Sequence, residues 1–181
     1  MAKTLIATAT ASSSSSLSFT SGIDSTYDVY EFHFVNMHPS ASNPNFAFQV
    51  NAVGQSGYNE TIQSSAFRAY HNEGNTSANL EYRGGDDQAN GTSYQIIAEA
   101  TPNAVADNSV CGILTLWNPA STTYVKHFTS RAFGNAYGEA EHDLFVAGYI
   151  NTTSAIDEID FKFSSGNIDA GTIKMYGIAK A

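Results

Sequence analysis

The side chains best suited to acid, base or metal chemistry in this sequence are five histidines. They are His33, His38, His71, His127 and His142. None of them stands in a sequence motif that would make it a metal ligand or a general base. The first and fourth fall within strand-like runs, and the last stands between two acidic residues, whose side chains a strand would turn to the opposite face. The histidines are therefore interpreted as structural.

The sequence also contains none of the short motifs that announce catalysis or a bound cofactor. It has no Gly-x-Ser-x-Gly elbow, no phosphate-binding Gly-Lys-Ser or Gly-Lys-Thr loop, no His-Glu-x-x-His pair and no paired cysteines. The prediction is a protein that is not an enzyme, with no catalytic residues and no cofactor. A distant pair of carboxylates, such as Asp86 and Glu141, is the weaker alternative of an acid/base enzyme.

A cation site is a second alternative, because Asp86, Asp87 and Asn90 bring hard oxygen ligands to a turn-rich segment that also contains Gly91. Their spacing does not match an EF-hand loop. The sequence therefore favours a solvated acidic loop, and no metal site is predicted.

A glycan platform is a third alternative, because exposed aromatic rings present both an apolar face and a polar edge. Aromatic residues at strand spacing are more often part of a core, so packing is the main interpretation. The candidate rings are Tyr58, Tyr70, Tyr82, Tyr94, Trp117, Tyr124 and Tyr137.

Composition and charge exclude several classes of partner. The 181 residues carry a net charge of −9, which repels phosphate backbones and anionic membrane surfaces. No apolar run approaches the roughly 20 residues that span a bilayer. Cys111 is the only cysteine, so no intrachain disulfide can form, and its strand context predicts a buried small hydrophobe.

Alternation of apolar and polar residues predicts an all-β fold, an antiparallel β-sandwich or jelly roll in a single domain. In the clearest run Tyr30, Phe32 and Phe34 share one face, and Phe46, Phe48 and Val50 repeat the pattern. No helix is predicted. The expected strands, roughly ten in number, include residues 4–9, 17–20, 29–35, 45–51, 66–70, 93–99, 110–117, 123–129, 143–150, 156–163 and 172–178.

Two segments differ from this pattern. Residues 1–16 are rich in Ala, Ser and Thr, and are expected to form an arm or an edge strand that precedes the sandwich of residues 17–181. Residues 72–92 are mostly Asn, Gly, Ser, Glu and Asp, and are expected to form a long exposed loop that makes contacts. The opening residues also lack a signal-peptide core, which favours synthesis in a cytoplasm; the four Asn-x-Ser/Thr sequons are then chance products.

Four segments together resemble a group of small structural proteins of tailed bacteriophages, especially those of marine cyanobacteria. The end of the chain is one, with Ser-Gly-Asn at 165–167 followed by Gly-Thr-Ile-Lys-Met-Tyr-Gly-Ile at 171–178. The others are the Ser-rich start with Thr-Tyr-Asp at 26–28, the Leu-Trp-Asn-Pro turn at 116–119, and Ala-Gly-Tyr-Ile-Asn-Thr-Thr-Ser-Ala-Ile-Asp at 147–157. These are structural features rather than active-site signatures.

The resemblance implies a virion structural protein, made in the host cytoplasm and carried on the outer surface of the particle. The first choice is a capsid decoration or cement protein that binds the major capsid protein or other virion proteins, itself a homo-oligomer with a trimer favoured. A tail fibre, collar or baseplate module with possible binding of host glycans is the alternative. The residues expected at the interfaces are Thr4, Leu5, Ile6, Tyr82, Asp86 and Asp87.

Overall fold

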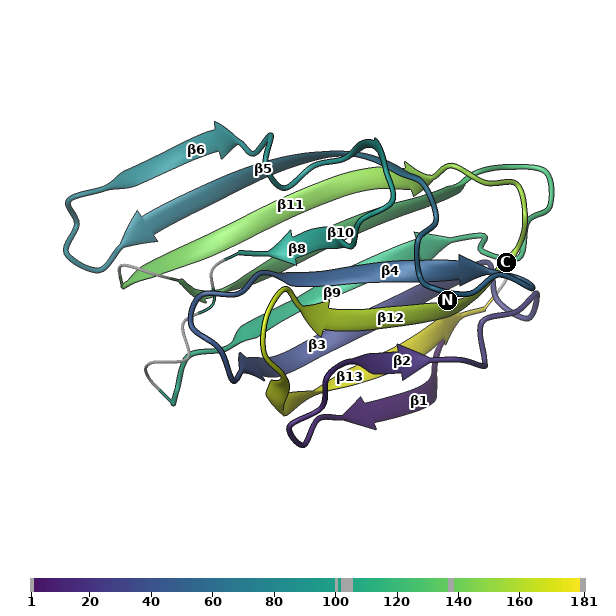
Figure 1. The fold of residues 1–181 in the computed structure, drawn as a ribbon, viewed down its shortest axis with the longest axis horizontal. Coiled ribbons are helices and arrows are strands. Elements are labelled where there is room, and N and C mark those ends of the chain that lie inside the picture. The colour runs from purple at the N-terminus through teal and green to yellow at the C-terminus, as the bar shows by residue number, and fades with distance from the viewer. Residues whose placement is uncertain (1, 100, 102–105, 137–138, 180–181) are drawn as a thin grey trace.

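The computed structural model describes residues 2–99, 101, 106–136 and 139–179. Within these ranges there is no helix, and antiparallel strands form two sheets that pack face to face (Figure 1). The predicted all-β sandwich is confirmed. No helix long and apolar enough to cross a bilayer occurs in the described part of the chain.

The larger sheet has nine strands in the spatial order β1-β13-β3-β9-β10-β11-β5-β6, with β7 paired to β5 beside this path. Its strands are β1 (Lys3–Thr10), β3 (Val29–Pro39), β5 (Ile62–Asn72), β6 (Ala78–Tyr82), β7 (Ala89–Gly91), β9 (Val110–Trp117), β10 (Lys126–Ala136), β11 (Ala140–Ile150) and β13 (Ile168–Ile178).

The smaller sheet has four strands in the order β2-β12-β4-β8. They are β2 (Leu17–Phe19), β4 (Phe46–Ala52), β8 (Gln95–Ala98) and β12 (Ile156–Phe163). It covers only part of the larger sheet, and in Figure 1 β5 and β6 extend beyond it. We call the face of the larger sheet that is turned toward the smaller one the inner face, and the opposite face the outer face.

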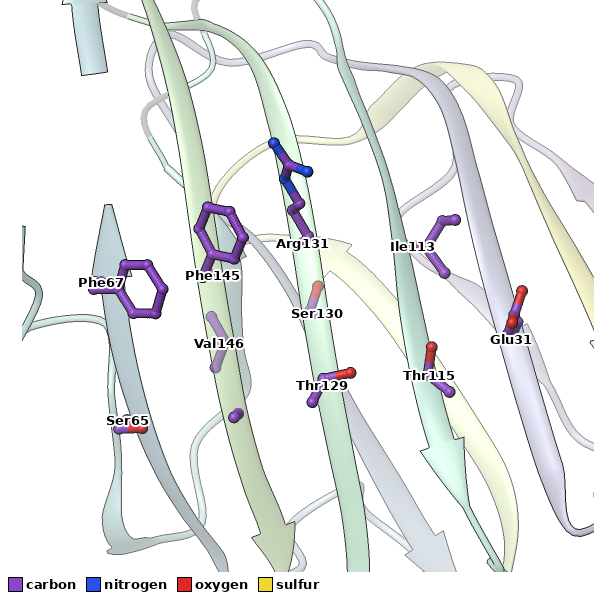
Figure 2. Close-up of a pocket in the computed structure, with 11 residues that line it drawn as sticks. Glu31, Ser65, Phe67, Ile113, Thr115, Thr129, Ser130, Arg131, Phe145 and Val146 are labelled. Atoms are coloured by element: carbon purple, nitrogen blue, oxygen red, sulfur yellow. The ribbon is translucent and has the colours of Figure 1, made fainter. Parts of the chain in front are cut away.

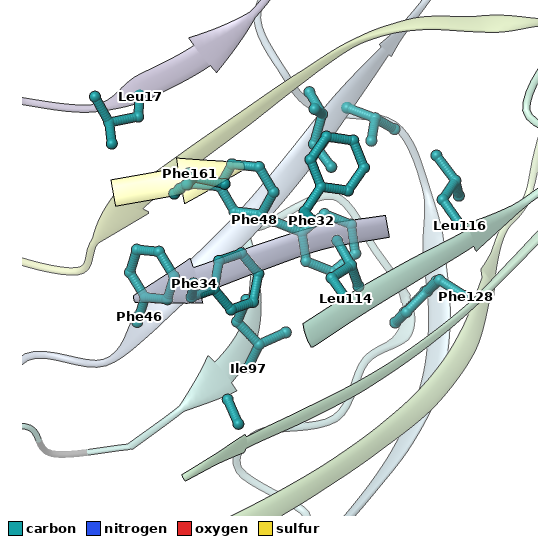
Figure 3. Packing of buried hydrophobic residues seen from close by; sticks show 14 of the residues in the cluster. Leu17, Phe32, Phe34, Phe46, Phe48, Ile97, Leu114, Leu116, Phe128 and Phe161 are labelled. Atoms are coloured by element: carbon teal, nitrogen blue, oxygen red, sulfur yellow. The ribbon is translucent and has the colours of Figure 1, made fainter. Parts of the chain in front are cut away.

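The core between the sheets is built around phenylalanine (Figure 3). Phe161 of β12 lies 5.5 Å from Phe32 and 5.3 Å from Phe34, centroid to centroid, so one ring of the smaller sheet touches two neighbours on β3. The expected alternation of β3 is confirmed, since Tyr30, Phe32 and Phe34 are all buried. Burying each such ring stabilises the fold by about 1.5–3 kcal/mol.

The abundance of asparagine has a conformational reason. Asn36, Asn43, Asn75, Asn90 and Asn118 all adopt positive φ angles between 46° and 56°. Asparagine tolerates this left-handed region better than most residues, because its short amide bonds to the local backbone. Many of the polar residues in the turns are therefore needed to reverse the chain between strands.

Several predicted boundaries were wrong. The strand expected at 123–129 begins only at Lys126 and continues to Ala136 as β10. The segment 72–92 is not one loop, since it contains β6 and β7. Of the two alternatives for residues 1–16, an arm or an edge strand, the structure shows the edge strand, because β1 pairs along its length with β13 at the edge of the larger sheet.

Candidate functional site: the outer face of the larger sheet

The outer face of the larger sheet carries most of the exposed apolar side chains of the described residues. Ten large hydrophobic side chains are exposed among the described residues. Strand register places eight of the ten on the outer face. A face that gathers many exposed apolar side chains is a candidate site of interaction. The eight are Leu5, Val35, Phe67, Leu80, Tyr82, Ile113, Trp117 and Phe133.

A raised row of bulky side chains crosses the strands on this face, and we call it the ridge. Its centre is a stack in which the rings of Phe67 and Phe145 lie 4.8 Å apart and nearly parallel. The guanidinium of Arg131 lies 4.8 Å from the centre of the Phe145 ring, as a cation–π contact. From β3 to β6 the ridge consists of His33, Ile113, Arg131, Phe145, Phe67 and Tyr82.

A row of small side chains runs beside the ridge, two residues along each strand, and we call it the trough. Figure 2 shows the two rows side by side, with Phe67, Phe145, Arg131 and Ile113 in one and the smaller residues in the other. The hollow has a volume of about 420 Å³. From β3 to β5 the trough consists of Glu31, Thr115, Thr129, Ala147 and Ser65.

Most charged groups of this face are paired with one another, and the two outside these pairs among the described residues, Glu141 and Lys174, are of opposite sign. The Arg131 guanidinium donates to Asp143 at 2.7 and 3.0 Å, and the Lys3 ammonium donates to Glu31 at 2.5 Å. Burial raises the pKa of Glu31, but hydrogen bonds from Lys3 and His33 outweigh it and hold this pKa below its ordinary value. The outer face is thus close to electrically balanced in a protein with a net charge of −9.

A second cluster of ionisable groups lies at the inner side of β5, beyond the edge of the smaller sheet. Glu99, which follows β8, accepts from Arg68 at 2.7 Å and from Arg83 at 2.5 Å. Arg68 also pairs with Glu81, and Arg83 donates to Asp86 at 2.9 Å. We call these residues, together with His142, the ionic cluster.

Burial shapes the titration of the ionic cluster. It raises the pKa of Asp86 to about 7, and the neighbouring Glu99 carboxylate adds to this effect. Burial also raises the pKa of Glu99, but hydrogen bonds and the two arginines outweigh it, so this pKa is held well below its ordinary value. The hollow beside Glu99 and His142 has a volume of only about 10 Å³, which leaves no room for a substrate. The arrangement joins β5, β8 and β11.

The residues predicted for the interfaces are distributed over three places. Thr4 and Leu5 are exposed on the edge strand β1, while Ile6 is half-buried and packs against the core. Tyr82 is exposed at the end of the ridge, and its hydroxyl donates to the adjacent Asp87. The role of these residues as contacts stays a prediction.

Asp86 is a correction, because it was expected on an exposed loop. Its side chain is only 6% exposed and pairs with Arg83 inside the ionic cluster. The three oxygen-bearing residues of the cation alternative do not converge either, since Asp87 bonds to Tyr82 and the side chain of Asn90 bonds to Asn151. Among the described residues, no group of three or more His, Cys, Asp or Glu is placed to hold a metal ion.

The aromatic rings weighed as a glycan platform do not share one surface. Tyr82 and Trp117 lie on the outer face, whereas Tyr58 and Tyr94 line a hollow of about 320 Å³ on the far side of the smaller sheet. There the Tyr94 hydroxyl donates to Asp160 at 2.9 Å. Tyr124 is exposed before β10, and Tyr137 lies outside the described residues.

Cys111 was expected to be buried, and this was wrong. It is half-buried on the outer face, where its thiol lies 3.4 Å from the backbone nitrogen of Asn36. The prediction for the histidines within strands is confirmed for His33 in β3 and His127 in β10. His142 points inward at Glu99, at 3.6 Å, while the neighbouring Asp143 faces outward.

The ridge and the trough were missed by the reasoning from sequence. A signal was present in β11, where Leu144, Phe145 and Val146 are consecutive large apolar residues. Apolar and polar residues alternate along a strand that has one face in solvent. Large apolar residues on both faces of a strand therefore indicate that both faces are buried against something. The same reasoning applies to Phe67, which follows the inward Ala66.

Comparison with known proteins adds no relative, because no family model and no curated protein matches the sequence.

Proposed function

We propose that this protein is a structural component of a bacteriophage virion, most consistently a capsid decoration protein that reinforces the outer shell. The observation that carries the proposal is the uncovered apolar outer face, with the Phe67–Phe145 stack at its centre. Such a face gains free energy only when another surface covers it, as in an assembly. A partner that binds the folded state stabilises it by mass action.

The edge strand β1 offers a second contact of a different kind. It pairs with β13 on one side, and no described strand pairs with its other side. An open edge can accept a strand from a neighbouring subunit through backbone hydrogen bonds. Leu5 is 52% exposed on this strand, so an added strand would also cover an apolar side chain. These features support a role in binding repeated protein subunits, such as the major capsid protein.

The charge of the protein supports protein partners over nucleic acid. A net charge of −9 opposes binding to phosphate, and the outer face holds its cations in pairs with Asp143 and Glu31. The resemblance to phage structural proteins rests on segments that form β12, β13 and the turns before β10 and β12. These segments build the framework of the sandwich.

A tail module that binds host glycans is the second candidate. The observation that favours it is the hollow on the far side of the smaller sheet, where Tyr58 and Tyr94 meet Asp160 and Lys162. The Lys162 ammonium lies 3.8 Å from the centre of the Tyr94 ring. Aromatic faces beside hydrogen-bonding groups are suited to sugars. A glycan array with a Tyr94→Ala control tests this candidate.

The test of the first candidate is the abundance and place of the protein on purified particles. Quantitative mass spectrometry is expected to find it in hundreds of copies, on the order of the capsid subunits, and cryo-electron microscopy is expected to place it on the shell. A dozen copies or fewer, located at the tail, would support the second candidate. Absence from the particle would contradict both.

A further inference from the structure

We propose that two copies of this protein pair through their outer faces, with the ridge of each copy seated in the trough of the other. This pairing rests on the proposed function, in which another protein surface covers the outer face. Here that surface is the outer face of a second copy. The pairing also rests on the shape of the face, on its charge and on the size of its apolar area.

The shape argument starts from the register of the strands. The ridge and the trough are parallel rows that cross the same strands, and on each strand they are separated by two residues, as in Phe145 and Ala147. A two-fold axis that lies between the facing sheets, parallel to these rows, exchanges ridge and trough. The ridge of the first copy therefore fits the trough of the second, and the ridge of the second fits the trough of the first. This is the self-complementarity that a two-fold interface requires.

This axis also fixes which residues meet. Because the rotation preserves position along the axis, each ridge residue approaches the trough residue of the equivalent strand in the second copy. Phe145 is set over Ala147 on β11, and Phe67 over Ser65 on β5. On β9 Ile113 is set over Thr115. Large side chains thus face small ones on β9, β10, β11 and β5, as in the interdigitated faces of packed sheets.

Charge favours a copy of this chain on this face. Two molecules of charge −9 repel at long range, so they associate best through a surface without excess acid. On the outer face Arg131 is matched by Asp143, and Glu31 by Lys3 and His33. The axis further brings His33, at one end of the ridge, toward Glu31 of the second copy. This contact is complementary in charge when the histidine is protonated.

The opposite side of the sandwich lacks this balance. On β12 Asp157 and Glu158 are half-buried acidic residues and Asp160 is buried, and Lys162 is the one cation of that strand. Pairing through that side would bring like charges together at a cost in affinity. The outer face, with eight exposed large hydrophobic side chains, also has the apolar content of interfaces between identical subunits.

Sedimentation of the full-length protein tests the pairing. The unchanged protein is expected to sediment as a dimer at high concentration and to dissociate on dilution. Ala147→Arg places a long charged side chain on the exposed floor of the trough, and is expected to raise the dissociation constant by about 100-fold or more. Ala170→Arg is the matched control, since Ala170 is also an exposed strand alanine but lies at the far end of β13. It is expected to dimerise normally.

Cys111 supplies a second measurement that needs no substitution. It lies on the outer face beside the ridge, paired in register with Phe133. Labelling by a bulky thiol reagent is expected to slow as the concentration of the unchanged protein rises, and to be independent of concentration in Ala147→Arg. If Ala147→Arg does not fold, as judged by circular dichroism, this measurement on the unchanged protein decides the matter.

Several outcomes would overturn the pairing. They are a monomer at every concentration, a trimer, a dimer that Ala147→Arg leaves intact, or concentration-independent labelling of Cys111. Any of these, combined with hundreds of copies on the particle, would leave the proposed function standing with a different occupant on the face. If the protein dimerises in solution but is absent from particles, the pairing stands and the proposed virion role is contradicted.

Discussion

The two faces of the larger sheet differ in how their side chains are covered. The inner face packs the aromatic residues of β3 against Phe161 of the smaller sheet, and beyond that sheet it is closed by the ionic cluster around Glu99. The outer face carries another aromatic pair, Phe67 and Phe145, with nothing from the described chain above it. Burial within the molecule explains the first arrangement, and the proposed association would explain the second.

The comparison teaches that apolar content alone does not distinguish a core from an interface. Both faces contain stacked or edge-on phenylalanines, but the inner ones are almost fully buried, while Phe67 is 46% exposed. The free energy of unfolding of the isolated protein is therefore expected to depend on the inner face, and the proposed association on the outer face.

The largest effect is expected from truncating a ring on the inner face. Phe32→Ala should lower the free energy of unfolding by about 3–5 kcal/mol, because it removes a fully buried ring and leaves a cavity. The matched substitution on the outer face, Phe67→Ala, should cost less than about 1 kcal/mol in the monomer. Urea-induced unfolding of both variants measures the difference. Equal losses for the two variants would show that the outer face is already covered within the molecule.

A somewhat smaller effect is expected in the ionic cluster that closes the inner face. Glu99→Ala leaves Arg68 and Arg83 without their shared carboxylate, and should cost about 3 kcal/mol, the low end for breaking a buried pair. The exposed Glu73, in the turn after β5, provides the control Glu73→Ala. Urea-induced unfolding again gives the values, and a cost below that of the control would mean that the cluster does not hold the sheets together.

The smallest effect is a dependence on pH. The pKa of Asp86 is about 7 in the folded protein and 3.8 in a free side chain, so the unfolded protein loses this proton first. The free energy of unfolding should then fall as the pH rises from 3.8 to 7. Asp86→Asn removes this titration, so its stability relative to the unchanged protein should increase as the pH rises from 5 toward 8.

Thermal unfolding of the two proteins across this pH range checks the prediction. The hydrogen bond with Asp86 is one of the interactions that lower the pKa of Glu99, so the two proteins are compared above pH 5, where Glu99 is ionised in both. A difference that stays constant with pH would contradict the raised pKa of Asp86.

Much of the fold could be predicted from the sequence, because local alternation determines which strand residues face inward. The runs of β3, β4 and β12 were identified with their buried residues, and Phe46, Phe48 and Val50 are indeed all buried. The short β6 and β7 were missed, since their residues are mostly polar and are held by pairing to β5. Pairing with a distant strand leaves no signal in a short window of sequence.

The site was harder to predict, because it depends on which strands become neighbours. The ridge joins Phe67, Arg131 and Phe145 from three strands that are adjacent in space and separated in sequence. The position of Asp86 shows the same limit, since its side chain is buried beside Arg83 and beside Glu99, which follows β8. The composition of residues 84–87 predicts a solvated loop, but ion pairing with residues distant in the fold buries Asp86.

The position of β1 bears on how the protein folds. Among the described residues its strand partner is β13, with Lys3 opposite Ile178, so this pairing joins two strands that stand far apart in the sequence. Strands this far apart in the sequence pair slowly, because the intervening chain loses conformational entropy before the contacts between the strands can stabilise the fold. Until then, both β1 and the neighbouring edge of the larger sheet are exposed. The folding protein is therefore most vulnerable to mispairing and to chaperone capture in the interval before β1 and β13 have paired.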